Sequence, residues 1–257
     1  MSDAGLPAGA AVRAPGQAAA RPVAPGVTAA EMLGAAEGSR GLRQRRLCFA
    51  AGAELAGAAA GLGEAWYVAG GGGWLEAAVP GGEGRPGGEG GPSGPGTVAL
   101  EPGTAVWLRR SLRYACRAGS QGLQIAAVTV RAGSPGDDAG PALRVARLDQ
   151  CAPERTGDRE FRVLLSPGLA ITQFVGEIPP GRAPAHRHPY DEVVHVLAGR
   201  GVVHLAGARA AIAPGTSIYL PPGQPHCLEN TGREPLRVLG VFHPAGSPAS
   251  KQPGAAG

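Results

Sequence analysis

Cysteine is scarce in this chain, and its four residues lie far apart. Cys48, Cys116, Cys151 and Cys227 form no pair separated by two residues. This spacing excludes the close thiolate pairs of zinc ribbons and dithiol redox motifs, and it offers no disulfide framework. We therefore expect reduced thiols and a cytoplasmic protein.

Lysine is almost absent, since Lys251 is the only one. The formal net charge of +4 at pH 7 comes almost wholly from arginine. Two arginine clusters, at residues 43–46 and 109–117, are the candidates for a basic surface, and no helix-turn-helix or zinc-finger spacing accompanies them. We expect scattered, solvated arginines and no nucleic acid partner.

Long apolar runs are missing too. No stretch reaches the length that spans a bilayer, so no membrane segment is predicted. Residues 1–39 lack the uninterrupted apolar core of a signal peptide. Because they are rich in alanine, proline and glycine, they predict a disordered N-terminal tail.

Glycine and proline are abundant, with 44 and 25 residues respectively. The length suits two small domains, each able to bury a core. The composition predicts a first domain over residues 40–132, a linker over 133–158, a second domain over 159–246 and a disordered tail over 247–257. Residues 80–96, nearly all glycine, proline and glutamate, predict a loop that buries no apolar surface.

The densest functional signal lies between residues 179 and 230. His186 and His188 are two residues apart, so on a strand they project from one face, and Glu192 keeps that parity if the extended chain continues. His226 follows a Pro-Pro-Gly turn that would direct it back across the sheet. Three imidazoles and one carboxylate predict a site for one divalent transition metal ion, and Fe, Mn, Ni, Co, Cu or Zn would suit it.

These residues resemble the two motifs of the cupin superfamily, G(X)5HXH(X)3-4E(X)6G and G(X)5PXG(X)2H(X)3N. The second motif matches Gly215 to Asn230 without a gap. The first matches His186 to Gly199, with Gly181 one residue closer to His186 than the motif has it. The resemblance implies an all-β fold, a small antiparallel jelly-roll barrel with the metal inside, ligated by the positions of His186, His188, Glu192 and His226.

The first half of the chain repeats the second in outline. Glu64 and Gly71 have the spacing of the motif's glutamate and final glycine, and residues 102–108 align with 214–220. The positions of the three histidines are taken by Ala58, Ala60 and Tyr114, so we expect this half to lack a metal and to play a structural role. The chain is thus expected to be a bicupin of two jelly-roll barrels, with an extensive interface between the repeats.

The predicted site leaves two adjacent positions on an octahedral ion open for a substrate. Tyr190, Tyr219, Gln224 and Arg182 are the substrate-binding candidates nearest in sequence, and no catalytic residue can be named. His195 has the opposite parity to Glu192, so we expect it to face the other sheet or domain.

Two functions agree with these features. The cupin resemblance implies a metal-dependent enzyme acting on a small organic, oxygen-rich or carboxylate substrate, either a dioxygenase or a hydrolase or isomerase. Two domains with one intact site resemble ureidoglycine aminohydrolase in architecture. The alternative is a non-catalytic barrel that holds a metal or small molecule for sensing or storage. Both are compatible with a homodimer.

Overall fold

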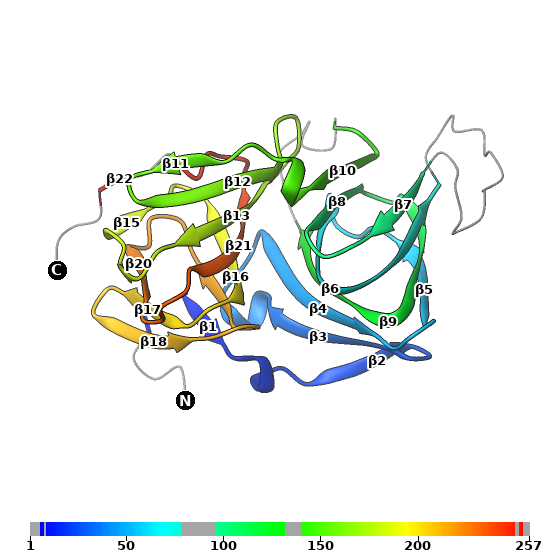
Figure 1. Cartoon of the computed structure of the whole chain (residues 1–257), viewed down its shortest axis with the longest axis horizontal. Coiled ribbons are helices and arrows are strands. Elements are labelled where there is room, and N and C mark those ends of the chain that lie inside the picture. Colours follow the sequence, from blue (N-terminus) through cyan, green and yellow to red (C-terminus); the bar gives the residue numbers. More distant parts are fainter. Residues whose placement is uncertain (1–5, 8, 79–95, 132–139, 250–251, 254–257) are drawn as a thin grey trace.

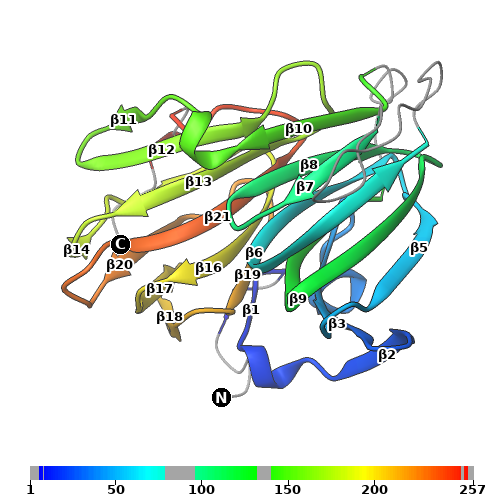
Figure 2. The ribbon, with the colours of Figure 1, turned by 45° about the vertical axis from the view of Figure 1, so that its right-hand side comes forward.

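The computed structural model describes residues 6–7, 9–78, 96–131, 140–249 and 252–253. These residues form β-strands and three 3-10 turns, η1 (Pro15–Gln17), η2 (Ala35–Glu37) and η3 (Leu148–Gln150), arranged as two barrels side by side (Figures 1 and 2). The strands pair antiparallel, so the predicted all-β, two-barrel architecture is confirmed. In the described ranges, no helix has the length and apolar character needed to cross a membrane.

The first barrel is one nine-stranded sheet. Its main path runs β10-β8-β6-β9-β4-β3-β2, while β5 pairs with β9 and β7 pairs with β6. The strands are β2 (Ala20–Ala24), β3 (Val27–Leu33), β4 (Leu42–Phe49), β5 (Glu54–Ala58), β6 (Gly63–Ala77), β7 (Thr97–Leu100), β8 (Thr104–Arg109), β9 (Arg113–Val130) and β10 (Leu143–Arg147). β6 and β9 are the longest strands, and each pairs with three others: β6 with β7, β8 and β9, and β9 with β4, β5 and β6. The predicted loop at residues 80–96 falls almost wholly outside the described residues.

The second barrel is a sandwich of two sheets. One has the order β1-β19-β16-β21-β13-β12-β11, and the other has the order β18-β17-β20-β15-β22, with β14 paired to β20. Its strands are β1 (Ala11–Arg13), β11 (Glu154–Thr156), β12 (Arg159–Leu165), β13 (Thr172–Ile178), β14 (Gly181–Arg182), β15 (His186–Arg187), β16 (Asp191–Ala198), β17 (Gly201–Leu205), β18 (Ala208–Ile212), β19 (Ser217–Leu220), β20 (His226–Asn230), β21 (Leu236–His243) and β22 (Gln252–Pro253).

The two barrels exchange their first strands. β1 precedes the first barrel in sequence, yet it pairs with β19 of the second, with Ala11 opposite Tyr219. β10 precedes the second barrel, yet it pairs with β8 of the first, with Leu143 opposite Leu108. Figure 1 shows β1 lying against the second barrel and β10 lying against the first. The internal repeat predicted from sequence therefore extends upstream to these two strands.

One tight turn is common to the two repeats. Gly71 and Gly199 both adopt left-handed backbone angles, with φ of 71° and 82°. A Cβ at Gly71 would lie 2.2 Å from the backbone oxygen of Gly122, and one at Gly199 would lie 2.9 Å from the backbone of Leu236. Only glycine fits this conformation without strain, which explains why the motif's final glycine is present in both halves.

A shared hydrophobic core joins the two barrels. It includes Met32, Leu42 and Trp107 from the first barrel and Val193 and Val241 from the second, all of them at most 1% exposed. A second core fills the first barrel around Trp66, and a third lies between the two sheets of the second barrel around Val203. The predicted extensive interface between the repeats is thus confirmed.

The predicted domain boundaries need three corrections. Residues 1–39 are not a disordered tail, because β1, β2 and β3 lie within them. The predicted linker at 133–158 contains β10, η3 and β11, and so belongs to both barrels. The tail at 247–257 is partly ordered, since Tyr190 Oη donates to the Ser247 carbonyl at 3.0 Å and β22 pairs with β15. In each case pairing with a distant strand orders a segment whose own composition favours disorder.

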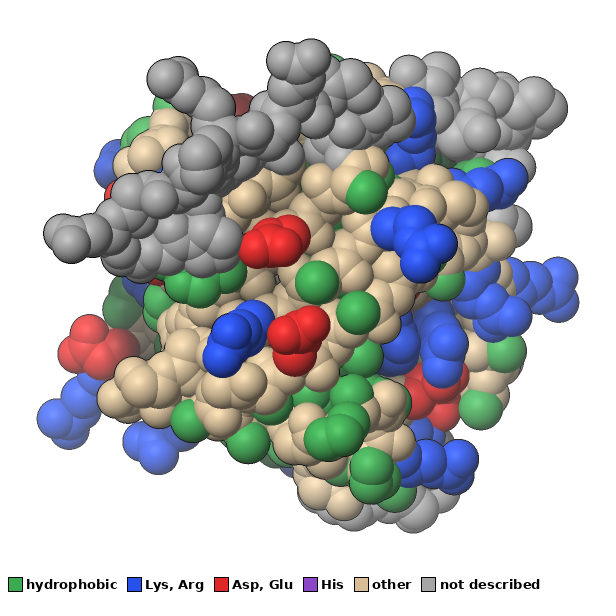
Figure 3. All heavy atoms as spheres, turned by 90° about the vertical axis from the view of Figure 1, so that its right-hand side faces the viewer, with side chains coloured by type: hydrophobic (Ala, Val, Ile, Leu, Met, Phe, Trp, Pro, Cys, Tyr) green, Lys and Arg blue, Asp and Glu red, His purple; other side chains and the backbone are tan. Residues whose placement is uncertain are grey.

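The arginine clusters do not form a continuous basic surface. On the face of the first barrel shown in Figure 3, basic side chains lie in separate groups with uncharged and acidic surface among them. Arg43 pairs with Glu31, and Arg45 pairs with Glu64 at 3.2 Å. Arg109 and Arg110 donate to the backbone carbonyls of Gly140 and Gly61. Most of these cations therefore serve local structure.

Candidate metal centre

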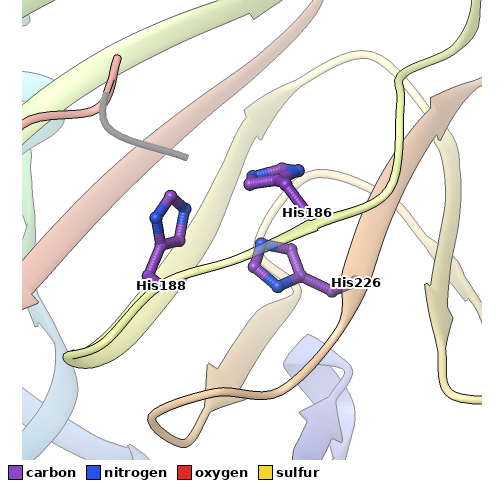
Figure 4. Close-up of side chains that lie close together, drawn as sticks. All are labelled: His186, His188 and His226. Carbon is purple, nitrogen blue, oxygen red and sulfur yellow. The ribbon is translucent and has the colours of Figure 1, made fainter. Parts of the chain in front are cut away.

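Three histidines meet in the second barrel as predicted. His186 lies in β15, and His188 is the first residue after that strand. His226 begins β20, where it stands opposite His186 in the strand register. One ring nitrogen from each lies within 4.8 Å of the others. Figure 4 shows the three rings turned toward a common space. This grouping could hold a metal ion.

Backbone carbonyls orient two of the rings. Nδ1 of His226 lies 2.9 Å from the Gln224 carbonyl oxygen, and Nδ1 of His186 lies 3.2 Å from that of Pro184. A carbonyl can only accept, so each Nδ1 carries the proton and each Nε2 presents a lone pair. Burial, with His226 as a further cause, lowers the pKa of His186 to about 2, so its imidazole is neutral. Neutral imidazoles fixed in this way suit metal ligation.

Glu192 adds a carboxylate to the three imidazoles. Its Oε2 lies 3.7 Å from Nε2 of His188 and 3.8 Å from Nε2 of His226. These separations are too long for hydrogen bonds, and Oε2 has no hydrogen-bond partner among the described residues. Burial raises the pKa of Glu192 to about 8. A buried carboxylate oxygen without a donor is costly, and a cation at the centre would stabilise it.

The predicted side chains come together, but not through the continuous extended chain that the parity argument assumed. The chain does not continue extended from His188 to Glu192, because β15 ends at Arg187 and β16 begins at Asp191 after a bend. Glu192 therefore comes from a different strand, where it pairs with Leu220 and Phe242 in the sheet. A turn brings it back beside the histidines.

The four groups border a small, mainly apolar cavity of 80 Å³. Phe161, Phe174, Val194 and Phe242 form part of its wall. Arg159, at the start of β12, also lines it, and the Nε of this residue is buried without a hydrogen-bond partner in the described part of the chain. Burial lowers the pKa of Arg159, and its charge helps to lower that of His186. The cavity thus has a cation on its wall beside the histidines.

Sequence reasoning missed Arg159, although a signal for it exists. Arg159, Phe161 and Val163 alternate along β12, so they share one face of the strand. Phe161 is 4% exposed and faces the cavity, and the same parity directs Arg159 there. The predicted boundary makes Arg159 the first residue of the second domain, directly after the predicted linker, so the sequence prediction does not place it on the alternating face of β12.

The four substrate-binding candidates from the sequence are placed outside the lining of this cavity. Tyr190 stacks on the His188 ring with centroids 5.2 Å apart, while its hydroxyl donates a hydrogen bond to the Ser247 carbonyl. Tyr219 donates from Oη to Asp191 at 2.6 Å and belongs to the core between the barrels. Gln224 donates to the Pro225 carbonyl, and Arg182 is exposed with its Nε 3.3 Å from the Cys227 sulfur. Proximity in sequence did not predict the cavity wall, which comes partly from β12 and β13.

In the first barrel, Glu64, which aligns with Glu192, accepts several hydrogen bonds. Trp66 Nε1 donates to Glu64 Oε2 at 2.8 Å, and Arg45 and the Ala60 amide donate to Oε1. The Tyr114 ring meets the Trp66 ring edge-on at 4.9 Å. The buried carboxylate at the position of Glu192 is therefore satisfied by the protein's own donors, which removes the need for an ion.

His195 faces the other domain, as predicted. It lines a cavity between the barrels together with Arg46 and Gln124 of the first barrel, and its Nδ1 lies 3.1 Å from the Ser217 hydroxyl. Burial, with Arg46 as the second cause, lowers the pKa of His195 to about 4. His204 instead pairs with Glu229 at 2.7 Å.

Comparisons with known proteins agree with this geometry. The Cupin domain family model matches residues 174–242, which span β13 to β21 and hold all four groups of the centre. An uncharacterised protein of Methanocaldococcus jannaschii is 33% identical over 103 residues, covering 37% of this chain and 82% of that protein. The oxalate-binding protein of Thermotoga maritima is 34% identical over 68 residues, covering 26% of this chain and 56% of its own.

Similarity to solved structures extends over both barrels. An oxalate decarboxylase of Bacillus subtilis, in a structure whose subject is its Mn(II) centres, superposes with a TM-score of 0.68 and 16% identity. The match covers 90% of this chain and 76% of that one. At this identity the likeness concerns the fold, and it supports the two-barrel arrangement.

Proposed function

We propose that this chain, which belongs to the cupin superfamily, is a metal-dependent enzyme that binds a small carboxylate in its second barrel. The observation that carries the proposal is the cavity itself, where three imidazoles and a buried carboxylate oxygen without a hydrogen-bond partner meet the half-buried Arg159, whose Nε also lacks a hydrogen-bond partner among the described residues. An ion and an anionic ligand together would satisfy both unmatched groups.

The metal ligands in this proposal are His186, His188, Glu192 and His226. The residues fit a divalent first-row ion, because nitrogen and carboxylate donors suit such ions and the carboxylate oxygen has no other partner. Manganese is a first candidate, since the solved two-barrel relative is described by its Mn(II) centres. A bound ion would act as a Lewis acid toward a substrate oxygen.

Arg159 is proposed to hold the carboxylate of the substrate. A guanidinium binds a carboxylate through two parallel hydrogen bonds, and it does so more strongly where water is excluded. The cavity has a volume of 80 Å³ and is mainly apolar, and apart from the histidines Arg159 is the only basic side chain among the described residues that line it. Oxalate and similar small acids fit this description, as the names of two relatives suggest.

The alternative is a carboxylate-binding barrel without turnover, and one observation favours it. Apart from the four proposed ligands and Arg159, the titratable residues that line the described cavity are Glu160 and Glu177. Both are engaged in ion pairs, Glu160 with Arg162 at 2.8 Å and Glu177 with Arg237 at 2.7 Å. Their ion pairs make both carboxylates poor candidates for a general acid or base, which favours binding without turnover.

The test uses manganese-loaded protein with oxalate as the first probe, followed by glyoxylate, malonate and acetate. Calorimetry measures binding, and product analysis measures turnover. Arg159→Gln should weaken oxalate binding about tenfold or more, because a charge-assisted hydrogen bond contributes at least about 1.4 kcal/mol. Arg155→Gln is the matched control, since Arg155 lies on the same hairpin with its side chain 80% exposed.

The outcomes separate the hypotheses. Binding with turnover supports the enzyme, and binding without turnover supports the alternative. Equal oxalate affinity in Arg159→Gln and in wild type would contradict the role of Arg159, provided that both proteins hold the same amount of metal.

A further inference from the structure

A second cavity lies between the two barrels and shares no lining residue with the metal centre. Its volume is 260 Å³. Arg46 and Gln124 come from the first barrel, and His195 comes from the second. The remaining walls are mostly apolar and come from both barrels: Pro15, Ala69, Ile125, Ala126, Val196, Leu197, Pro214 and Gly215.

Arg46 brings an uncompensated positive charge to this cavity. Among the described residues that line it there is no carboxylate, and the buried Nε of Arg46 has no hydrogen-bond partner among them. The other two arginines of β4 behave differently, because Arg43 pairs with Glu31 and Arg45 pairs with Glu64. The guanidinium of Arg46 extends toward the Gly215 turn, where NH1 lies 3.8 Å from the position of a Cβ on that glycine.

The equivalent groove on the other side of the interface lacks this charge imbalance. It has a volume of 680 Å³, and Tyr67 stands where His195 stands in the smaller cavity. Its arginines are neutralised, for instance Arg237 by Glu177 and Arg147 by Glu101. In the strand register the counterpart of Arg46 is Val175, because Arg46 lies opposite Ala126 and Val175 lies opposite Leu239, and Val175 does not line the larger groove. The repeat therefore does not require a cation at this place.

His195 supplies a second polar group to the same cavity. Its side chain is buried, at 6% exposure, and Nδ1 is engaged with the Ser217 hydroxyl. Nε2 is then the ring nitrogen left for a ligand, and it donates in the tautomer in which Nδ1 accepts from the Ser217 hydroxyl. Because the nearby Arg46 and burial both disfavour protonation, His195 stays neutral at neutral pH and could be a hydrogen-bond donor beside the guanidinium.

We propose that this cavity binds a small organic carboxylate, held by Arg46, with His195 and Gln124 as further donors. The carboxylate head would meet the guanidinium in the bidentate geometry that this pair favours. The apolar walls favour a ligand with an apolar body over inorganic phosphate, whose oxygens would be left without donors on several sides. The bound ligand would contact both barrels.

The experiment titrates metal-loaded, full-length protein with benzoate and, separately, with inorganic phosphate, by calorimetry. We expect saturable benzoate binding that Arg46→Gln weakens about tenfold or more. Arg43→Gln is the matched control on the same strand, and Arg159→Gln tests whether benzoate occupies the metal cavity instead. Both should bind benzoate as wild type does.

Several results would overturn the proposal. These are the absence of saturable binding, equal affinity in Arg46→Gln, loss of binding in Arg159→Gln, and tighter binding of phosphate than of benzoate. A second measurement needs no variant: imidazole resonances of wild-type protein followed by NMR against pH. Benzoate should raise the pKa of His195, because an anion favours the protonated ring, and an unchanged His195 titration at saturating benzoate would also refute the proposal.

Discussion

The buried His195 should make the stability of the protein depend on pH in a defined window. Its pKa is lowered from 6.5 to about 4, chiefly by burial and then by Arg46. A group with a depressed folded pKa binds a proton more readily in the unfolded chain, so it leaves stability unaffected above pH 6.5 and reduces it as pH falls. Folding therefore becomes less favourable between about pH 6.5 and pH 4.

The size of this effect follows from the two pKa values. With 6.5 in the unfolded state and about 4 in the folded state, the free energy of unfolding falls by about 2 kcal/mol at pH 5 and about 3 kcal/mol at pH 4. These are appreciable fractions of the stability of an ordinary domain.

The assay compares wild type with His195→Gln by urea denaturation at several pH values, in buffers without carboxylates. Glutamine keeps a polar side chain near Ser217 and does not titrate. The pKa of His186 is also depressed, so the wild-type curve alone would combine several groups, whereas the difference between the two proteins isolates His195. Wild type should lose about 3 kcal/mol relative to His195→Gln between pH 7.5 and pH 4. A difference that stays constant over this range would refute the reasoning.

Three further predictions concern the metal and the interface. Native protein should contain one tightly bound metal ion per chain, measured by elemental analysis, and two equivalents would contradict the loss of the site in the first barrel. His188→Ala should remove the metal and lower the melting temperature, since a ligand that binds only the folded state stabilises it, whereas unchanged metal content would show that His188 is not a ligand. A fragment beginning at Cys151 should self-associate or precipitate in light-scattering measurements, because it lacks β1 and exposes the shared core around Val193 and Val241. A monomeric, fully active fragment would contradict this last prediction.

The grouping of the three histidines could be predicted because its information is local. His186, His188 and His226 lie in short motifs whose spacing constrains the geometry, and each half of the repeat supports the other through Glu64, Gly71 and their counterparts. The structure brings the three histidines together through the pairing of β15 with β20, while Glu192 is positioned by the pairing of β16 with β19 and β21, all within residues 186–243.

The wall of the cavity and the first strands could not be predicted in the same way. Arg159 reaches the cavity from a hairpin upstream of the motif, and the hairpin's position depends on pairing between β12 and β13. Ala11 to Arg13 lie in a segment rich in alanine, proline and glycine, and they become a strand only because β19 offers a free edge. Local composition contains no information about a partner so far along the chain.

The exchange of β1 and β10 has a consequence for synthesis. β1 leaves the ribosome long before its partner β19 at Ser217–Leu220 has been made, since most of the described strands lie between them in sequence. The first barrel also cannot close its sheet until β10 has emerged, after its own last strand. Neither barrel can therefore be completed from a contiguous stretch during translation, and β1 must wait for its partner until β19 has been made.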